Sequence, residues 1–326
     1  MGFGRKENVA SLRDSFAEVL HRVGKEDPNL VVLVGDISHF RLQPFAKDCP
    51  GRYYNVGICE STIVNMAAGL AKVGFYPVVH TISPFIVDRS FEQLKLDFCY
   101  QKLGGNIVTV GSAFDYANLG CTHHCYGDFA LLKTLPGTQI FYPATEVEFE
   151  TLFRQSYNHG TLNYFRVPMQ GHPYDFDPKQ IKAGKAIRLQ AGEEVTIIAV
   201  GSQLRTALDA MEPLNQLGVS VDLIYIHTVK PFDEALINAS LFKTHKCLVI
   251  EEHSVFGGVF DDVLRASRII ENVRYASIAI PNTFIREYGT YQQHCQRLGF
   301  SVEGILRKVK DELLNYSETL NNRFSP

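Results

Sequence analysis

Patterns of strand and helix alternate along almost the whole chain, and this alternation limits the possible folds more than any other feature. Residues 30–34 form a continuous apolar run, which is typical of a buried strand in a parallel sheet. Residues 146–157 and 204–217 are instead predicted helices. Strands that alternate with helices predict an α/β fold, in which helices cover both faces of mainly parallel sheets.

One segment, residues 168–184, lacks periodicity and contains Pro168, Pro173 and Pro178, so we interpret it as a linker. A chain of 326 residues suits about two domains. The sequence therefore predicts two doubly wound domains, residues 1–175 and 176–326. The predicted strands are residues 30–34, 76–81, 106–110, 139–142, 163–167, 195–200, 219–226, 247–250 and 275–280. The predicted helices are residues 11–23, a segment that starts at Glu60, and residues 90–103, 129–135, 146–157, 204–217, 233–242, 257–270 and 302–314.

The composition narrows the class of protein. The net charge is −3 and there is no basic tract, so the sequence predicts neither nucleic-acid nor membrane binding. No apolar run approaches the length of a membrane span, and residues 1–7 lack the apolar core of a secretory signal. The seven cysteines are an odd number scattered along the chain, which favours reduced thiols. We expect a cytoplasmic protein.

The most informative stretch is Tyr54-Asn-Val-Gly-Ile-Cys-Glu60, which leads into a run of small and apolar residues up to Ala71. Apolar positions at helical spacing predict a largely buried helix that begins at Glu60. A carboxylate in a first turn often does no more than complement the helix dipole. The alternative is a carboxylate held in a dry pocket for proton transfer.

The motif Gly-Ile-x-Glu at residues 57–60, with Ala-Ala-Gly-Leu-Ala at residues 67–71, resembles the pyrimidine-binding domain of transketolase-family enzymes. The resemblance extends over nearly the whole chain and implies that the family's C-terminal domain follows. In that family this Glu binds a ring nitrogen of the aminopyrimidine of thiamine diphosphate, and so helps the cofactor lose its thiazolium proton. The resemblance implies that Glu60 is catalytic and binds this cofactor.

Further cofactor contacts are expected where strands end, because ligands gather at the carboxyl ends of strands in open α/β sheets. Asp36 follows the first strand. An Asx-turn or a helix cap would explain it equally well, but the resemblance places an Asp of the family near the thiazolium at this point.

The family motif F-x-x-F-x-x-x-R-x-x-E-Q, which lines the aminopyrimidine pocket, resembles residues 82–93 here. Phe85 and Arg89 match it, while Ile82 stands in place of the first aromatic residue. A Phe is commonly a core residue, so the resemblance alone implies a cofactor role for Phe85. Stacking would rest on Phe85, with Ile82 packing against the pyrimidine face.

The loop Gly-Cys-Thr-His-His-Cys at residues 120–125 allows two interpretations. Two His between two Cys suggest zinc, but no second Cys/His pair stands at ligand spacing, so we expect no metal ligands in this chain. The loop resembles the family's G-x-T/S-H-Q, which implies that His123 contacts the substrate near its reacting hydroxyl or carbonyl. A neutral His can exchange protons there, although a His merely bonded within a loop remains the alternative.

Three positions bear on the substrate. The family usually has a His just after the third strand, where Gly111 stands here, and an Asp in the His loop, where Leu119 stands. Both departures place the ordinary pentose phosphate substrates in doubt. Arg166 matches a family Arg that binds substrate phosphate or another anion, and an Arg suits bidentate contacts with phosphate.

The Gly-Asp-Gly…Asn motif that holds magnesium and the diphosphate in this family is absent from the sequence. The resemblance therefore implies the C-terminal half of a split transketolase. Thiamine diphosphate and Mg²⁺ would bind with an N-terminal partner subunit, which would supply the Mg²⁺ ligands, in a heterotetramer of two plus two chains.

Three hypotheses for the function stay open. The first is a subunit that transfers a two-carbon ketol unit between sugar-type substrates, and His123 and Arg166 favour it. The second is the beta subunit of a 2-oxo acid dehydrogenase, or an acyl transferase similar to 1-deoxyxylulose-phosphate synthase. The third is a non-catalytic assembly or regulatory partner, which the departures at Gly111 and Leu119 favour.

Overall fold

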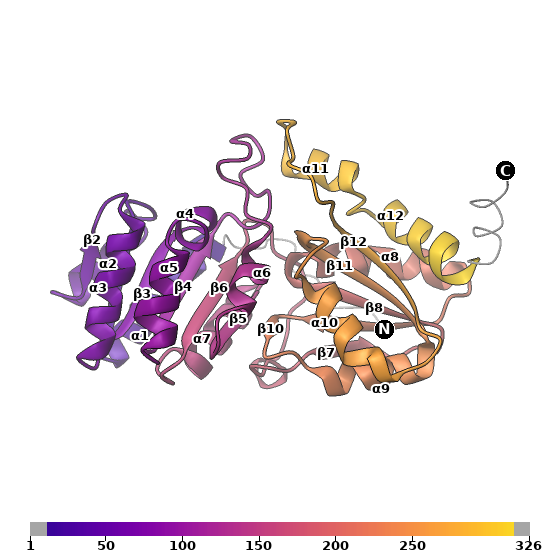
Figure 1. The fold of residues 1–326 in the computed structure, drawn as a ribbon, viewed down its shortest axis with the longest axis horizontal. Helices are drawn as coiled ribbons and strands as arrows, with labels where there is room; N and C mark the ends of the chain where they lie inside the picture. The colour runs from indigo at the N-terminus through magenta and orange to yellow at the C-terminus, as the bar shows by residue number, and fades with distance from the viewer. Residues whose placement is uncertain (1–11, 316–326) are drawn as a thin grey trace.

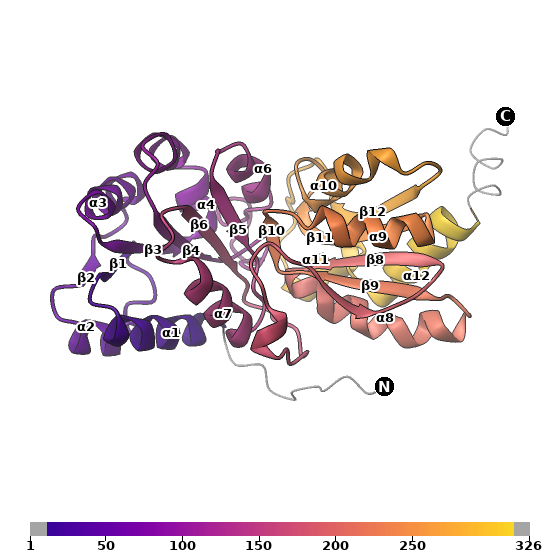
Figure 2. The ribbon, with the colours of Figure 1, turned by 90° about the horizontal axis from the view of Figure 1, so that it is seen from below.

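The computed structural model describes residues 12–315 and contains two α/β domains side by side (Figures 1 and 2). Ser11, the first residue of a predicted helix, and the amino-terminal residues 1–7 lie outside this range. No helix within residues 12–315 is both long enough and apolar enough to cross a membrane.

The sheet of the first domain has seven strands in the order β10-β5-β6-β4-β3-β1-β2. These are β1 (Leu30–Val34), β2 (Tyr53–Asn55), β3 (Tyr76–Ile82), β4 (Gly105–Val110), β5 (Thr138–Phe141), β6 (Leu162–Val167) and β10 (Thr228–Lys230). Every neighbouring pair is parallel except β10 and β5. The predicted parallel α/β domain is confirmed; β4 is its central strand, β1 lies next to the edge strand β2, and both are fully buried.

Helices cover both faces of this sheet (Figure 2). One face packs against α1 (Leu12–Glu26), α2 (Gln43–Asp48) and α7 (Glu146–Ser156). The other face packs against α3 (Glu60–Lys72), α4 (Ser83–Val87), α6 (Asp128–Lys133) and a helix that begins as α5 (Phe91–Gln93). The predicted helix at residues 90–103 is only partly α-helical, because α5 continues as a π-helix over Leu94–Tyr100.

The second domain repeats the arrangement with five strands in the order β12-β11-β8-β9-β7. The strands are β7 (Ile187–Gln190), β8 (Val195–Val200), β9 (Val221–Ile226), β11 (Lys246–Ser254) and β12 (Arg274–Ile280). Only the edge pair β7 and β9 is antiparallel. The helices are α8 (Leu204–Gln216), α9 (Glu234–Thr244), α10 (Val259–Ala266), α11 (Tyr291–Leu298) and α12 (Val302–Arg307), which continues as a π-helix over Lys308–Leu314.

The two domains are joined through a shared strand that the sequence did not predict. After β9 the chain leaves the second sheet, and β10 pairs antiparallel with β5 at the edge of the first sheet. The Tyr142 N–H donates a 2.8 Å hydrogen bond to the His227 carbonyl and extends this contact. The second domain therefore supplies an edge strand to the first, and the boundary after residue 175 stays a prediction.

Candidate active site

Glu60 opens α3 and is only 2% exposed. The Arg89 Nη1 donates a 2.7 Å hydrogen bond to Glu60 Oε2. The other carboxylate oxygen, Oε1, is buried and has no hydrogen-bond partner within residues 12–315. A buried acceptor that lacks a partner is uncommon and costs about 1–3 kcal/mol. The helix dipole accounts for a negative charge at this position, but it does not account for the unpaired oxygen.

Phe85 and Arg89 lie directly beside this carboxylate. Phe85 is on α4, which follows Ile82 at the end of β3. The Arg89 guanidinium carbon lies 4.6 Å from the centroid of the Phe85 ring, which is a cation–π distance. Glu60, Arg89 and Phe85 therefore form one continuous cluster, as the resemblance implied.

His123 joins this cluster from the loop between β4 and α6. Its ring meets the Phe85 ring edge to face, with 5.2 Å between centroids. The Thr122 Oγ1 lies 3.0 Å from His123 Nδ1, and the Tyr116 ring lies 5.8 Å away on another side. The structure thus connects the two residues predicted to be catalytic through Arg89 and Phe85.

Asp36 stands at the carboxyl end of β1 with a positive φ of 55°. Its backbone N–H donates to Asn55 Oδ1, and Asn55 Nδ2 donates to Asp36 Oδ1, both at 3.1 Å. This pair fixes the exposed Asp36 at the ends of β1 and β2. Its predicted contact with the cofactor stays a prediction.

Comparisons with known proteins place this arrangement in a family. The sequence model of the transketolase pyrimidine binding domain matches residues 8–171, and that of the transketolase C-terminal domain matches residues 184–305. This chain belongs to the transketolase family. It corresponds to the C-terminal section of those enzymes.

Relatives of this transketolase-family chain fall into two kinds. The chain is 31% identical over 304 residues to one of the subunits of apulose-4-phosphate transketolase from Phocaeicola vulgatus, a match that covers 92% of this chain and 96% of that protein. It is 30% identical over 312 residues to 1-deoxy-D-xylulose-5-phosphate synthase of Desulforudis audaxviator, but spans only 48% of that protein. Among solved structures, a split gene transketolase described as an inactive beta4 tetramer matches with a TM-score of 0.84 and 27% identity, over 94% of this chain and 99% of that one.

The loop after β4 differs from the usual transketolase pattern for a structural reason. Gly111 has a φ of +79°, and a Cβ built on it would lie 2.3 Å from Cε2 of Tyr116. A His at this position would therefore meet both the wrong backbone conformation and an occupied space. Tyr116 fills this place and faces His123, and sequence reasoning missed it. The sequence does show a glycine, Gly111, followed five positions later by an aromatic residue, Tyr116, and this was the signal that could have indicated the contact.

The structure places Arg166 in a buried setting, and its predicted contact with a substrate anion stays a prediction. Its side chain is fully buried, with Nε 3.2 Å from Asp128 Oδ2. The Nη2 group donates to the carbonyls of Cys125 and Glu252 at 3.0 and 2.9 Å, and the guanidinium lies over the Phe129 ring. Arg166 thus connects α6 with the second domain and lies beside the Asp128 carboxylate, while its Nε and Nη1 have no hydrogen-bond partner within residues 12–315.

Asp115 lies in the loop between β4 and α6, and the pKa of its carboxyl group is raised. Its Oδ2 accepts hydrogen bonds from the Ser112 N–H and the Met169 N–H, both at 3.0 Å. Burial, together with the nearby Glu252 carboxylate, raises the pKa of Asp115 to about 7. Elsewhere in the described residues, no three His, Cys, Asp or Glu side chains are grouped so that they could hold a metal ion.

We expect Arg166→Ala to destabilise the isolated chain by roughly 3–5 kcal/mol, because it leaves the buried Asp128 carboxylate uncompensated. Urea denaturation measures this free energy of unfolding. Arg22→Ala is the control, since Arg22 pairs with Glu150 at 2.6 Å on the surface, where such pairs contribute about 0–1 kcal/mol. Wild-type stability in Arg166→Ala would contradict the structural role.

We expect Asp115→Asn to flatten the dependence of stability on pH. The unfolded chain releases this proton near the ordinary pKa of 3.8, whereas the folded chain releases it near 7. The folded state therefore binds the extra proton between these values, and the wild-type free energy of unfolding falls as the pH rises through this window. Denaturation at pH 5, 6, 7 and 8 measures the difference between wild type and variant. Glu212→Gln, which alters an exposed carboxylate, is the control. Its free energy of unfolding should change with pH as that of the wild type does.

Proposed function

We propose that this chain is the C-terminal subunit of a thiamine diphosphate-dependent transketolase, which transfers a two-carbon ketol unit between sugar-type substrates. The unpaired, buried Oε1 of Glu60 carries the proposal. A ligand that completes this site must offer a hydrogen-bond donor or an atom that exchanges a proton with a carboxylate. A ring nitrogen of an aminopyrimidine meets this requirement.

The residues around Glu60 suit the rest of such a ring. The partly buried Ile82 and Phe85 would flank the pyrimidine, with Phe85 as the aromatic surface. Arg89 would keep Glu60 oriented through Oε2, and Asp36 would approach the cofactor from the end of β1. When bound, thiamine diphosphate supplies the carbon nucleophile that carries the two-carbon unit.

Glu60 and His123 would divide the proton transfers. Glu60 would hold or move a proton at Oε1, in a buried position where a positioned acid–base group is effective. His123 Nδ1 is occupied by Thr122, so we assign Nε2 to the hydroxyl or carbonyl of the substrate. Phe85 contacts His123 directly and reaches Glu60 through Arg89, so it would help to keep the two positions fixed relative to each other.

A partner subunit would complete the site. The relative from Phocaeicola vulgatus is named as one subunit of a transketolase, which supports a second subunit here. The partner would hold Mg²⁺ and the diphosphate, in a heterotetramer of two plus two chains.

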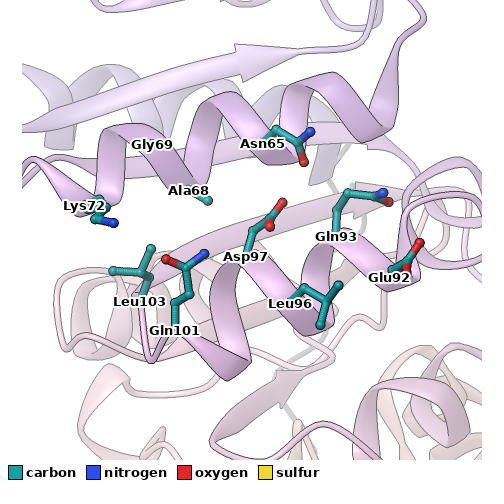
Figure 3. Close-up of a pocket in the computed structure, with 10 residues that line it drawn as sticks. All are labelled: Asn65, Ala68, Gly69, Lys72, Glu92, Gln93, Leu96, Asp97, Gln101 and Leu103. Carbon is teal, nitrogen blue, oxygen red and sulfur yellow. The ribbon is translucent and has the colours of Figure 1, made fainter.

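The surface beside α3 fits such a partner. A cavity of about 500 Å³ runs between α3 and the π-helix that follows α5 (Figure 3). Leu96 lines this cavity, and three further exposed apolar side chains, Ile58, Met66 and Tyr100, lie on or next to α3 and this π-helix. Exposed apolar surface of this kind marks interaction sites. A partner seated here would contact α3, the helix that begins at Glu60.

The acyl transferase alternative retains one observation in its favour. The match to 1-deoxy-D-xylulose-5-phosphate synthase is nearly as strong in identity as the match to the transketolase subunit. Screening the assembled complex with ketose donors and with 2-oxo acid donors separates the two activities. Release of CO2 from a 2-oxo acid, with no transfer from a ketose, would favour the alternative.

We expect Glu60→Gln to lower turnover of the assembled complex by roughly 10²–10⁴-fold, because an amide cannot exchange a proton with the ring nitrogen. Exchange of the thiazolium hydrogen with deuterated water, followed by NMR, measures the step directly. Glu146→Gln is the matched control, since Glu146 also opens a helix and pairs with an Arg, Arg22 at 3.2 Å. Wild-type exchange in Glu60→Gln would leave Glu60 with a dipole role alone and would remove the basis of the proposal.

We expect Leu96→Asp to weaken assembly with the N-terminal subunit by at least about tenfold, because it replaces an exposed apolar side chain of the proposed interface with a charge beside Glu92 and Asp97. Sedimentation of the mixed subunits measures the dissociation constant. Leu264→Asp on α10 is the control, since the two leucines are similarly exposed, at 43% and 37%. If both variants assembled like wild type, the partner would dock elsewhere.

A further inference from the structure

The turn that carries His123 is held from outside by the second domain. The Ser254 N–H at the end of β11 donates a 2.7 Å hydrogen bond to the Tyr126 carbonyl. The Tyr126 hydroxyl in turn donates to the Thr283 carbonyl at 3.4 Å. Residues 281–290, between β12 and α11, therefore lie against the His loop of the first domain (Figure 1).

The closest approach within this contact is at Gly120. A Cβ built on Gly120 would lie 3.0 Å from Cε1 of Tyr288, so the Tyr288 ring packs directly on the backbone of the turn. Gly120 has a φ of +73°, and its carbonyl accepts a 3.0 Å hydrogen bond from the His123 N–H. The position of the His123 backbone thus depends on a glycine against which Tyr288 is packed.

Most of the Tyr288 side chain is nevertheless open to solvent. The residue is 69% exposed, so contact with Gly120 uses only part of its ring. At residue 119 the apolar Leu119 stands where the family has an Asp that helps to select the sugar. Tyr288 brings an exposed aromatic surface from the second domain to the turn that carries His123, and aromatic side chains commonly line ligand sites.

We propose that Tyr288 is a positioning and specificity-determining residue for the substrate that meets His123. Its ring fixes the turn from Gly120 to His123, and its open face forms the outer wall against which the acceptor sugar packs. The specificity role rests on the proposed function, because it needs an acceptor sugar. The contact between Tyr288 and the His123 turn is independent of that function.

The contact is tested first in the isolated chain, without any activity. Histidine-labelled chain gives NMR signals for its 11 His rings, and His123→Asn identifies the signal of His123. Tyr288→Ala should shift the His123 signal, Tyr288→Phe should leave it in place, and His253, buried in the second domain, should report an intact fold. Phe284→Ala is the matched control, because Phe284 lies in the same segment and is 68% exposed.

The second arm uses a double-mutant cycle at Gly120. Gly120→Ala should displace the His123 signal in the wild-type background, since the new methyl group meets the Tyr288 ring. In the Tyr288→Ala background the same change should displace the signal less, because the space has been opened. Equal displacements in both backgrounds would overturn the proposed contact, as would an unmoved signal in Tyr288→Ala.

The third arm measures specificity in the assembled complex. Tyr288→Ala should raise the KM for the acceptor sugar by about tenfold, since a wall contact is largely uniform binding, and should also lower kcat, because the displaced turn carries His123. Tyr288→Phe should restore the wild-type KM. An unchanged acceptor KM in an active complex would overturn the specificity role, whereas a wild-type complex with no ketol transfer would refute the proposed function and leave the NMR result to decide the contact.

Discussion

Arg89 binds one oxygen of the buried Glu60 carboxylate and leaves the other open, and the candidate site is arranged around this half-satisfied group. Two features keep a charge in this position. Glu60 begins α3, where the helix dipole favours a carboxylate, and Arg89 supplies a charge-assisted hydrogen bond. The remaining oxygen has no partner within residues 12–315, so a ligand that donates a hydrogen bond to it would recover the free energy lost by leaving it unpaired.

The sequence predicted the framework of the fold because buried parallel strands are apolar enough to be recognised locally. All the strands predicted from it are present, including the fully buried β1 and β4 of the first sheet. It did not predict β10, because Thr228–Lys230 are only three residues and pair with β5, which is far away in the chain. The edge strands β2 and β7 were missed for the same reason, since a short strand depends on its neighbour more than on its own propensity.

The sequence predicted those site residues whose role follows from the chemistry of their own side chain. It was less informative where the role depends on burial and on neighbours that are distant in the sequence. Glu60, Phe85 and His123 come together as the resemblance implied. Arg166 was assigned to a substrate anion on its chemistry alone, and the structure adds the Asp128 carboxylate 3.2 Å from its Nε, which the sequence did not indicate. The difference lies in burial, which depends on how α6 and β11 close over the end of β6, and no local pattern records this.

The departures at Gly111 and Leu119 first favoured a non-catalytic partner, but the structure gives the departure at Gly111 a different meaning. A protein that had merely lost a catalytic His would be expected to leave space in its place. Here the Tyr116 ring fills that space, and it also lies 5.8 Å from the His123 ring. The loop closes on itself through the Ala113 and Cys125 bridge. A loop rebuilt with an aromatic wall beside His123 changes which substrate fits and still keeps His123 next to Phe85, so the pattern of changes favours an altered specificity over a lost activity.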